Sequence, residues 1–145
     1  MKALKTLLFI IICTASYIGC NKDRDNDVQD NIALTGTKWK LAALVDVQAH
    51  ESIKPEPKNC NTCYTLEFVS DTMAIGKSVS NTLHFIVTRS TIEMFLATEI
   101  GDGDQGNVGL FYEALQTLDT YEYNEEEFKI YYDKNKYLLY KPLLQ

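Results

Sequence analysis

An alternation of apolar and polar residues, beginning near Leu34, most constrains what this chain can fold into. Because successive side chains of a strand point to opposite faces, a period of two predicts a sheet with one buried face. The same period recurs in short segments separated by turn residues, which is typical of antiparallel strands. The first predicted strand has one apolar face, formed by Trp39, Leu41, Ala43, Val45 and Val47.

Seven further short segments carry the features of strands. Gly76 lies inside one of them, where glycine is typical of a bulge or bend. Residues 48–61, with Pro55 and Pro57, are expected to form a polar loop. Thr88-Arg89-Ser90 is the expected turn of one hairpin. The predicted strands span residues 64–68, 72–78, 83–87, 91–100, 120–123, 128–132 and 137–140.

The period changes once, after a loop rich in glycine and aspartate. Phe111, Leu115 and Leu118 have the spacing of one helix face, which predicts a helix over about 108–117. Asn107 stands where it would cap the N-terminus of that helix. Residues 34–145 are therefore expected to form a mainly β domain, a small antiparallel barrel or sheet with one helix packed on it.

The first twenty residues are typical of an export signal. Lys2 and Lys5 precede a short apolar run at 7–12, and the segment ends in Tyr17-Ile18-Gly19-Cys20. That ending resembles a lipobox, which implies cleavage after residue 19 and a lipid on Cys20 as the covalent modification of the mature chain. An ordinary secretory signal and a membrane span are the alternatives, although a span needs about 20 apolar residues.

The segment 20–33 is polar and acidic, and we expect a flexible tether there. Lys22-Asp23 resembles the retention or export signals that follow lipobox cysteines in some Gram-negative bacteria, although a soluble spacer fits equally well. Loss of Lys2 and Lys5 leaves 12 basic against 20 acidic residues, a net charge of about −8. This charge argues against nucleic acid as a partner. We expect a lipid anchor in the outer membrane, facing the periplasm or the surface, and another envelope protein or a small ligand as partner.

The order of several motifs resembles the META-domain proteins of bacterial envelopes, as a divergent lipoprotein branch. Gly36-Thr37-Lys38-Trp39-Lys40-Leu41 is similar to the family's opening, and Tyr64–Phe68 to its next strand motif. Asn81 lies near the usual Cys-Asn pair, with Ser80 replacing the cysteine. The 111–115 segment followed by 121–123 is similar to the family's helix and strand, and Leu138-Leu139-Tyr140 closes the domain. The resemblance implies a barrel-like β fold crossed by a helix and stress-related phenotypes, without a general catalytic activity.

Cys60-Asn61-Thr62-Cys63 contains the two cysteines that remain once Cys13 leaves with the leader and Cys20 takes a lipid. An oxidising envelope permits a disulfide between Cys60 and Cys63. A redox-active pair would need a depressed thiol pKa, which usually comes from a helix N-terminus, whereas a strand follows here. A zinc site would need two more ligands.

The loop 101–107 is the best candidate for a ligand or metal site. Asp102 and Asp104 occupy the first and third places of an EF-hand loop, but Gly106 and Asn107 do not suit the fifth and sixth. A looser calcium site at Asp102 and Asp104 stays open. The alternative is a tight connection made possible by glycine. Gly76-Lys77-Ser78 lacks the first glycine of a phosphate-binding loop.

Catalysis has little support in the sequence, because serine-hydrolase and zinc-protease motifs are absent. His50 falls in a polar loop, and His84 is expected to face solvent. We therefore expect a non-catalytic binding or structural role, with no catalytic residues. The alternatives are a lipocalin-like carrier of an apolar ligand and a thiol-redox protein using Cys60 and Cys63. The C-terminal tyrosines are expected to pack across paired strands, although stacking on sugars or a partner is also open.

Overall fold

A computed structural model describes residues 33–98 and 106–143 of the 145-residue chain. Over these residues the chain forms nine strands and one helix, and the predicted mainly β fold is confirmed. The elements are β1 (Lys38–Asp46), β2 (Glu51–Ile53), β3 (Thr65–Ser70), β4 (Met73–Lys77), β5 (Thr82–Val87), β6 (Ile92–Ala97), α1 (Val108–Leu115), β7 (Tyr121–Tyr123), β8 (Phe128–Asp133) and β9 (Lys136–Pro142).

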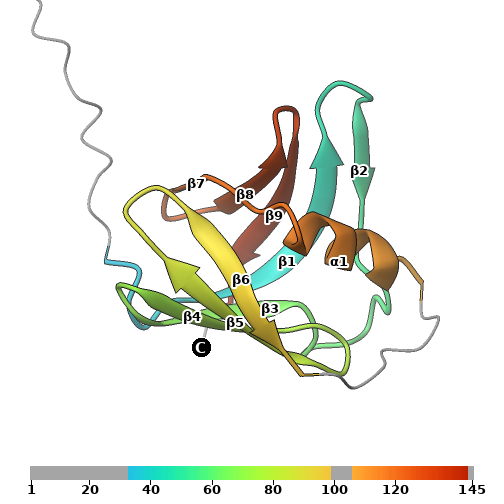
Figure 1. Ribbon diagram of the computed structural model, residues 1–145. Helices are drawn as coiled ribbons and strands as arrows, with labels where there is room; N and C mark the ends of the chain where they lie inside the picture. The colour runs from blue at the N-terminus through green and yellow to red at the C-terminus, as the bar shows by residue number, and fades with distance from the viewer. Residues whose placement is uncertain (1–32, 99–105, 144–145) are drawn as a thin grey trace, which may run out of the picture.

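All strands belong to one antiparallel sheet, ordered β6-β5-β4-β3-β1-β9-β8-β7, with β2 paired to β1 beside β3. The sheet curls into a half-barrel, and α1 lies across its open side (Figure 1). The two outer strands, β6 and β7, approach each other at one end, where an isolated bridge joins Thr91 and Thr120. There the Ile92 N–H donates to the Asp119 carbonyl oxygen at 2.9 Å. This bridge joins the two ends of the curled sheet.

Aromatic rings fill the interior. Phe128 is fully buried, and its ring centroid lies 5.5 Å from that of Trp39 and 5.2 Å from that of Phe68. From α1, Phe111 reaches the same core and meets Tyr64 edge-on at 5.0 Å. These rings bury much of the apolar surface that stabilises the domain. No helix among the described residues is long and apolar enough to cross a membrane.

A β-bulge in β1 corrects the predicted strand face. The register against β9 shifts between Leu41 and Ala43, so Leu44 turns into the core instead of Val45. Trp39, Leu41 and Ala43 are buried as expected, whereas Val47 is 52% exposed. One extra residue on one strand reverses which side chains point inward beyond it. The expectation that Val45 and Val47 share the buried face is therefore wrong.

The expected loop at 48–61 contains a short strand. β2 pairs with the end of β1, with Leu44 opposite Ile53 and Asp46 opposite Glu51. The turn between them is held by the Asp46 carboxylate, which accepts a hydrogen bond from the Ala49 N–H at 2.9 Å. All three residues of β2 are exposed, so no buried apolar side chain reveals this strand in the sequence.

The helix begins at the expected residue but ends at Leu115, two residues earlier than predicted. Asn107 occupies the N-cap position, yet its side chain makes no capping bond. Its amide oxygen instead accepts from the Glu56 N–H at 2.9 Å, and its amide nitrogen donates to the Lys54 carbonyl at 2.6 Å. Asn107 therefore ties the start of α1 to the chain that follows β2.

Gly76 does not mark a bulge. It pairs in regular register with Leu66 on one side and Leu83 on the other. A Cβ at this position would lie 2.9 Å from Cε2 of Phe85 and 3.0 Å from the Thr65 carbonyl oxygen. Glycine is required here because a buried ring occupies the space of a side chain.

This packing predicts that Gly76→Ala destabilises the domain by about 1–3 kcal/mol, the usual cost of overpacking a core. Gly109→Ala is the matched control, because a Cβ there meets no atom within 4 Å and alanine favours a helix by about 0.5–1 kcal/mol. Urea unfolding followed by the fluorescence of Trp39, the single tryptophan, measures both changes. Equal stability of the two variants would contradict the close approach at Gly76.

Candidate functional site

A surface groove of about 610 Å³ lies where α1 faces the β1–β2 hairpin and the β8–β9 turn. Its volume is in the range of small-molecule sites. It draws on three parts of the chain that are far apart in the sequence. The lining residues are Leu44, Val45, Asp46, Glu51, Ile53, Leu110, Glu113, Ala114, Thr117, Tyr132, Asp133 and Lys136.

Apolar side chains line part of the groove. Ile53 on β2 is 37% exposed and Leu110 on α1 is 42% exposed, which is high for large apolar residues. Val45 is half-buried and joins them because the β1 bulge turns it away from the core. Leu110 lies off the helix face that carries Phe111 and Leu115, so it is not needed for the core. These residues give the groove an apolar surface open to solvent.

The charged groups of the groove are mostly acidic. Four carboxylates face one ammonium group, and Lys136 is paired with Asp46 at 3.4 Å. The pKa of Asp46 is lowered, chiefly by the Ala49 N–H and then by Lys136. Glu51, Glu113 and Asp133 form no ion pair within the described part of the chain. An adjoining hollow adds one charge of each sign, Asp119 and Lys134.

A polar network fixes the helix wall of the groove. The Tyr112 hydroxyl donates to the Ser78 hydroxyl at 2.8 Å and accepts from the Asn81 side-chain amide at 2.8 Å. The Thr98 hydroxyl donates to the Asn81 amide oxygen at 2.9 Å. Ser78 and Asn81 are buried, so breaking these bonds would leave polar atoms without water. With Asn107 at its start, α1 is therefore held at both its first and its central turn.

Cys60 and Cys63 are bonded, with an S–S distance of 1.93 Å. The Lys40 ammonium donates to the carbonyl oxygens of both residues, 2.6 Å from that of Cys60, and burial lowers the pKa of Lys40. Cys63 is 3% exposed. The bond and this burial suit a structural disulfide ahead of β3 better than a redox pair. No group of three or more histidine, cysteine or acidic residues in the described ranges could hold a metal ion.

Several predicted site residues are not brought together. Cys20, Asp102 and Asp104 lie outside the described residues, so lipidation and the loop site stay predictions. His50 lies in the exposed β1–β2 turn, with a φ of 55°. His84 is half-buried on β5, and its ring centroid is 6.1 Å from that of Phe95.

The filled interior argues against the alternative of a lipocalin-like carrier with an internal cavity. Trp39, Leu66, Phe68 and Phe111 are each buried to 4% exposure or less and belong to one continuous core. Their side chains occupy the space that a lipocalin-like carrier would leave for its ligand. The groove, which lies outside this core, is the better candidate for binding.

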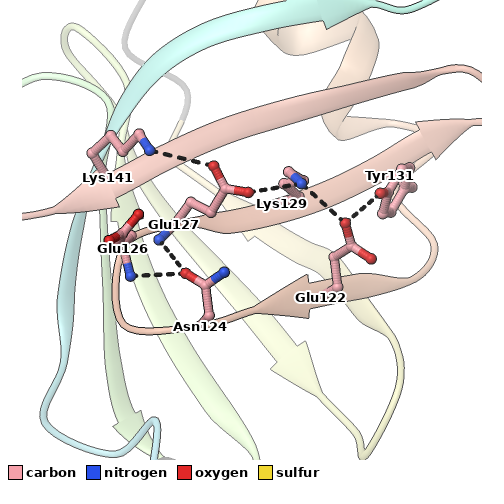
Figure 2. Close-up of polar contacts among 7 residues, drawn as sticks. All are labelled: Glu122, Asn124, Glu126, Glu127, Lys129, Tyr131 and Lys141. Atoms are coloured by element: carbon pink, nitrogen blue, oxygen red, sulfur yellow. Dashed lines mark hydrogen bonds and ion pairs between the residues drawn. The ribbon is translucent and has the colours of Figure 1, made fainter. Parts of the chain in front are cut away.

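A second polar surface covers β7, β8 and β9 (Figure 2). The Lys129 ammonium lies 2.8 Å from one Glu127 oxygen and 3.2 Å from a Glu122 oxygen, and Lys141 lies 3.3 Å from the other Glu127 oxygen. The Tyr131 hydroxyl donates to Glu122 at 2.7 Å, and burial with this carboxylate raises the pKa of Tyr131 to about 12. Because these charges neutralise one another, this surface stabilises strands instead of attracting a charged ligand.

The C-terminal tyrosines pack mainly across paired strands, as expected. Tyr121 stacks on Phe128 at 5.3 Å, and Tyr131 meets Tyr137 at 5.5 Å. Tyr132 is the exception, because it lines the groove.

Sequence reasoning missed the groove itself. The available indication was Leu110, a large apolar residue outside the predicted buried helix face.

Comparison with known proteins shows similarity both in sequence and in structure. A protein of Tannerella forsythia described as "Putative lipoprotein" is 37% identical over 140 residues, which cover 94% of this chain and 95% of that protein. No family model matches the chain.

The structural relatives share the fold. An NMR structure of a protein from Burkholderia xenovorans has a TM-score of 0.58 at 15% identity, covering 77% of this chain and 85% of that one. The crystal structure of a DUF4847 family protein from Bacteroides vulgatus has a TM-score of 0.57 at 11% identity, covering 80% of this chain and 99% of that one.

The ion pairs of Glu127 predict an acid-dependent contribution to stability. Hydrogen bonds from Lys129, and then from Lys141, lower the pKa of Glu127 below its ordinary 4.5. A lowered folded-state pKa stabilises the domain above pH 4.5, and this contribution is lost as the pH falls through the lowered value. Glu127→Gln should therefore cost about 0.5–1 kcal/mol at pH 7 and little at strongly acid pH.

The urea midpoints of the wild-type protein and of Glu127→Gln, measured from pH 7 downward, test this expectation. Glu125→Gln is the control, since Glu125 forms no ion pair among the described residues. A difference for Glu127→Gln that does not depend on pH would contradict the proposed charge pairing.

Proposed function

Because the chain belongs to the family of the Tannerella forsythia lipoprotein, we propose that Cys20 carries a lipid and that the domain is a non-catalytic binding module of the cell envelope. In this proposal the groove beside α1 is the binding site. The expected anchor is in the outer membrane, with the domain in the periplasm or on the surface.

The extent of the sequence match carries the proposal. Since 94% of 145 residues is about 136, the match leaves out about nine residues of this chain. Even if all of these lay at the N-terminus, the matched region would still include Cys20. The aligned region therefore extends from the folded domain to position 20 and into the leader, which supports lipidation here.

The direction of β1 separates the anchor from the groove. The chain enters β1 at Lys38, and the groove is lined by Val45 and Asp46 at the other end of the strand. Eight steps of about 3.3 Å make this separation roughly 26 Å. A tether attached ahead of Lys38 would leave the groove free for a partner.

The composition of the groove supports binding over catalysis. Among the described residues, its lining offers carboxylates, one ammonium group and two hydroxyls but no histidine or cysteine. The described lining therefore lacks a histidine that could activate a hydroxyl or thiol nucleophile, which favours a binding role in this proposal. Membership of a divergent META-like branch is part of the proposal. The family's expected opening forms the start of β1, and α1 precedes β7 as the resemblance implies.

Lipidation is tested by Cys20→Ser in a Gram-negative host. We expect the wild-type protein in the membrane fraction, extractable with detergent, and the variant in the soluble fraction, because acyl chains supply the anchor. Intact mass should show an acylated N-terminal Cys20 in the wild type. Cys13→Ser is the matched control, because its cysteine leaves with the leader.

A wild-type mass without a lipid would contradict the anchor, and so would membrane retention of a Cys20→Ser chain whose intact mass shows that the leader has been removed. A wild-type mass without a lipid would favour an ordinary secretory signal or an uncleaved span.

A further inference from the structure

We propose that the groove binds a cationic amphipathic segment of a partner protein. The apolar side chains of that segment contact Val45, Ile53 and Leu110, and its basic side chains lie at the acidic rim of the groove. This inference deepens the proposed binding function, and it stands apart from the question of lipidation.

The apolar part of the groove selects for a ligand with apolar groups. Ile53 and Leu110 belong to different elements and are both more than a third exposed. Each apolar side chain removed from water contributes about 25 cal/mol per Å² buried. A ligand made of charged groups alone would leave this surface wet, so the favoured ligand carries apolar side chains as well.

The charge of the groove selects for a cation. Four carboxylates against one ammonium leave a net charge of −3 on the lining. Because Lys136 is already paired with Asp46, the charges of Glu51, Glu113 and Asp133 stand without a cationic partner in the described structure. The adjoining hollow, with Asp119 and Lys134, does not change this balance. An anionic ligand such as a phosphate or a fatty acid would be repelled.

The chemistry of the groove favours a side-chain-bearing segment over a bare metal ion. No acidic cluster among the described residues could hold a metal. Lysine and arginine combine both requirements, since their methylene stems cover apolar surface while the charged head reaches the rim. The walls are already fixed by Asn107 and by the Tyr112 network, so little ordering free energy is lost on binding.

The position of the groove favours a protein over the membrane as the source of this segment. The groove lies at the end of β1 away from the entry of the tether. Its acidic rim would also be repelled by anionic lipid headgroups. A basic stretch on another envelope protein meets both conditions.

The test uses the mature chain carrying Cys20→Ser in detergent-free solution, so that binding is measured whether or not the native chain is lipidated. The probe is a fluorescein-labelled peptide of about 10 residues with alternating leucine and lysine, long enough to span about 30 Å. Fluorescence anisotropy gives its affinity. We expect binding that weakens several-fold as salt rises from about 0.05 to about 0.5 M, because salt screens exposed charges.

Three variants locate the binding site. Glu113→Gln should weaken binding about threefold to tenfold, as expected for one charge contact near a protein surface. Leu110→Ser should weaken it about as much through lost apolar contact. Both residues are exposed, so both variants should fold. Glu126→Gln, in the β7–β8 turn, is the matched control for net charge and should bind as the wild type does.

Four outcomes would overturn the proposal. Equal binding of a peptide with glutamate in place of lysine would exclude charge selection, and equal binding with serine in place of lysine would indicate a purely apolar site. Equal weakening by Glu126→Gln would indicate a response to net charge alone. Unchanged affinity in Glu113→Gln and Leu110→Ser would place the site elsewhere. A failed lipid anchor would appear instead in the membrane fractionation and leave these affinities unchanged.

Discussion

The antiparallel pairing of β1 holds the two halves of this domain together. One edge of β1 pairs with β9, and the other pairs with β3 near its start and with β2 near its end. Among the described strands, those on one side of β1 are linked to those on the other side through β1 and, at the outer ends, through the bridge between Thr91 and Thr120. The buried rings of Trp39 on β1, Phe68 on β3 and Phe128 on β8 meet across it. The curl of the sheet and the position of the core both follow from this pairing.

The groove also depends on β1. The bulge near Ala42 allows β1 to bury Leu44 and leaves Val45 at the surface, beside β2. α1 is then held against this surface by polar bonds at its first turn and at Tyr112. One wall therefore comes from the central strand and the other from a helix fixed independently of it. Both walls of the groove are therefore positioned by the fold itself.

Much of the fold could be predicted from the sequence because alternation reports burial directly. Leu66 and Phe68 on β3, and Phe111 and Leu115 on α1, are buried as their spacing indicates. The bulge could not be predicted, since it depends on how β1 aligns with β9 far along the chain. β2 was missed because none of its residues is buried. The groove combines Ile53, Leu110 and Lys136, which become neighbours only in the folded chain.

The direction of β1 also decides how the domain would bear mechanical load. If a lipid holds the chain ahead of Lys38 while a partner pulls at the groove, the force runs lengthwise along β1. The hydrogen bonds between β1 and β9 lie across that force from Trp39 to Asp46, so they resist it together. A pull applied across the strands would instead open these bonds one after another. The β1–β9 pairing therefore has shear geometry for a load applied at these two points.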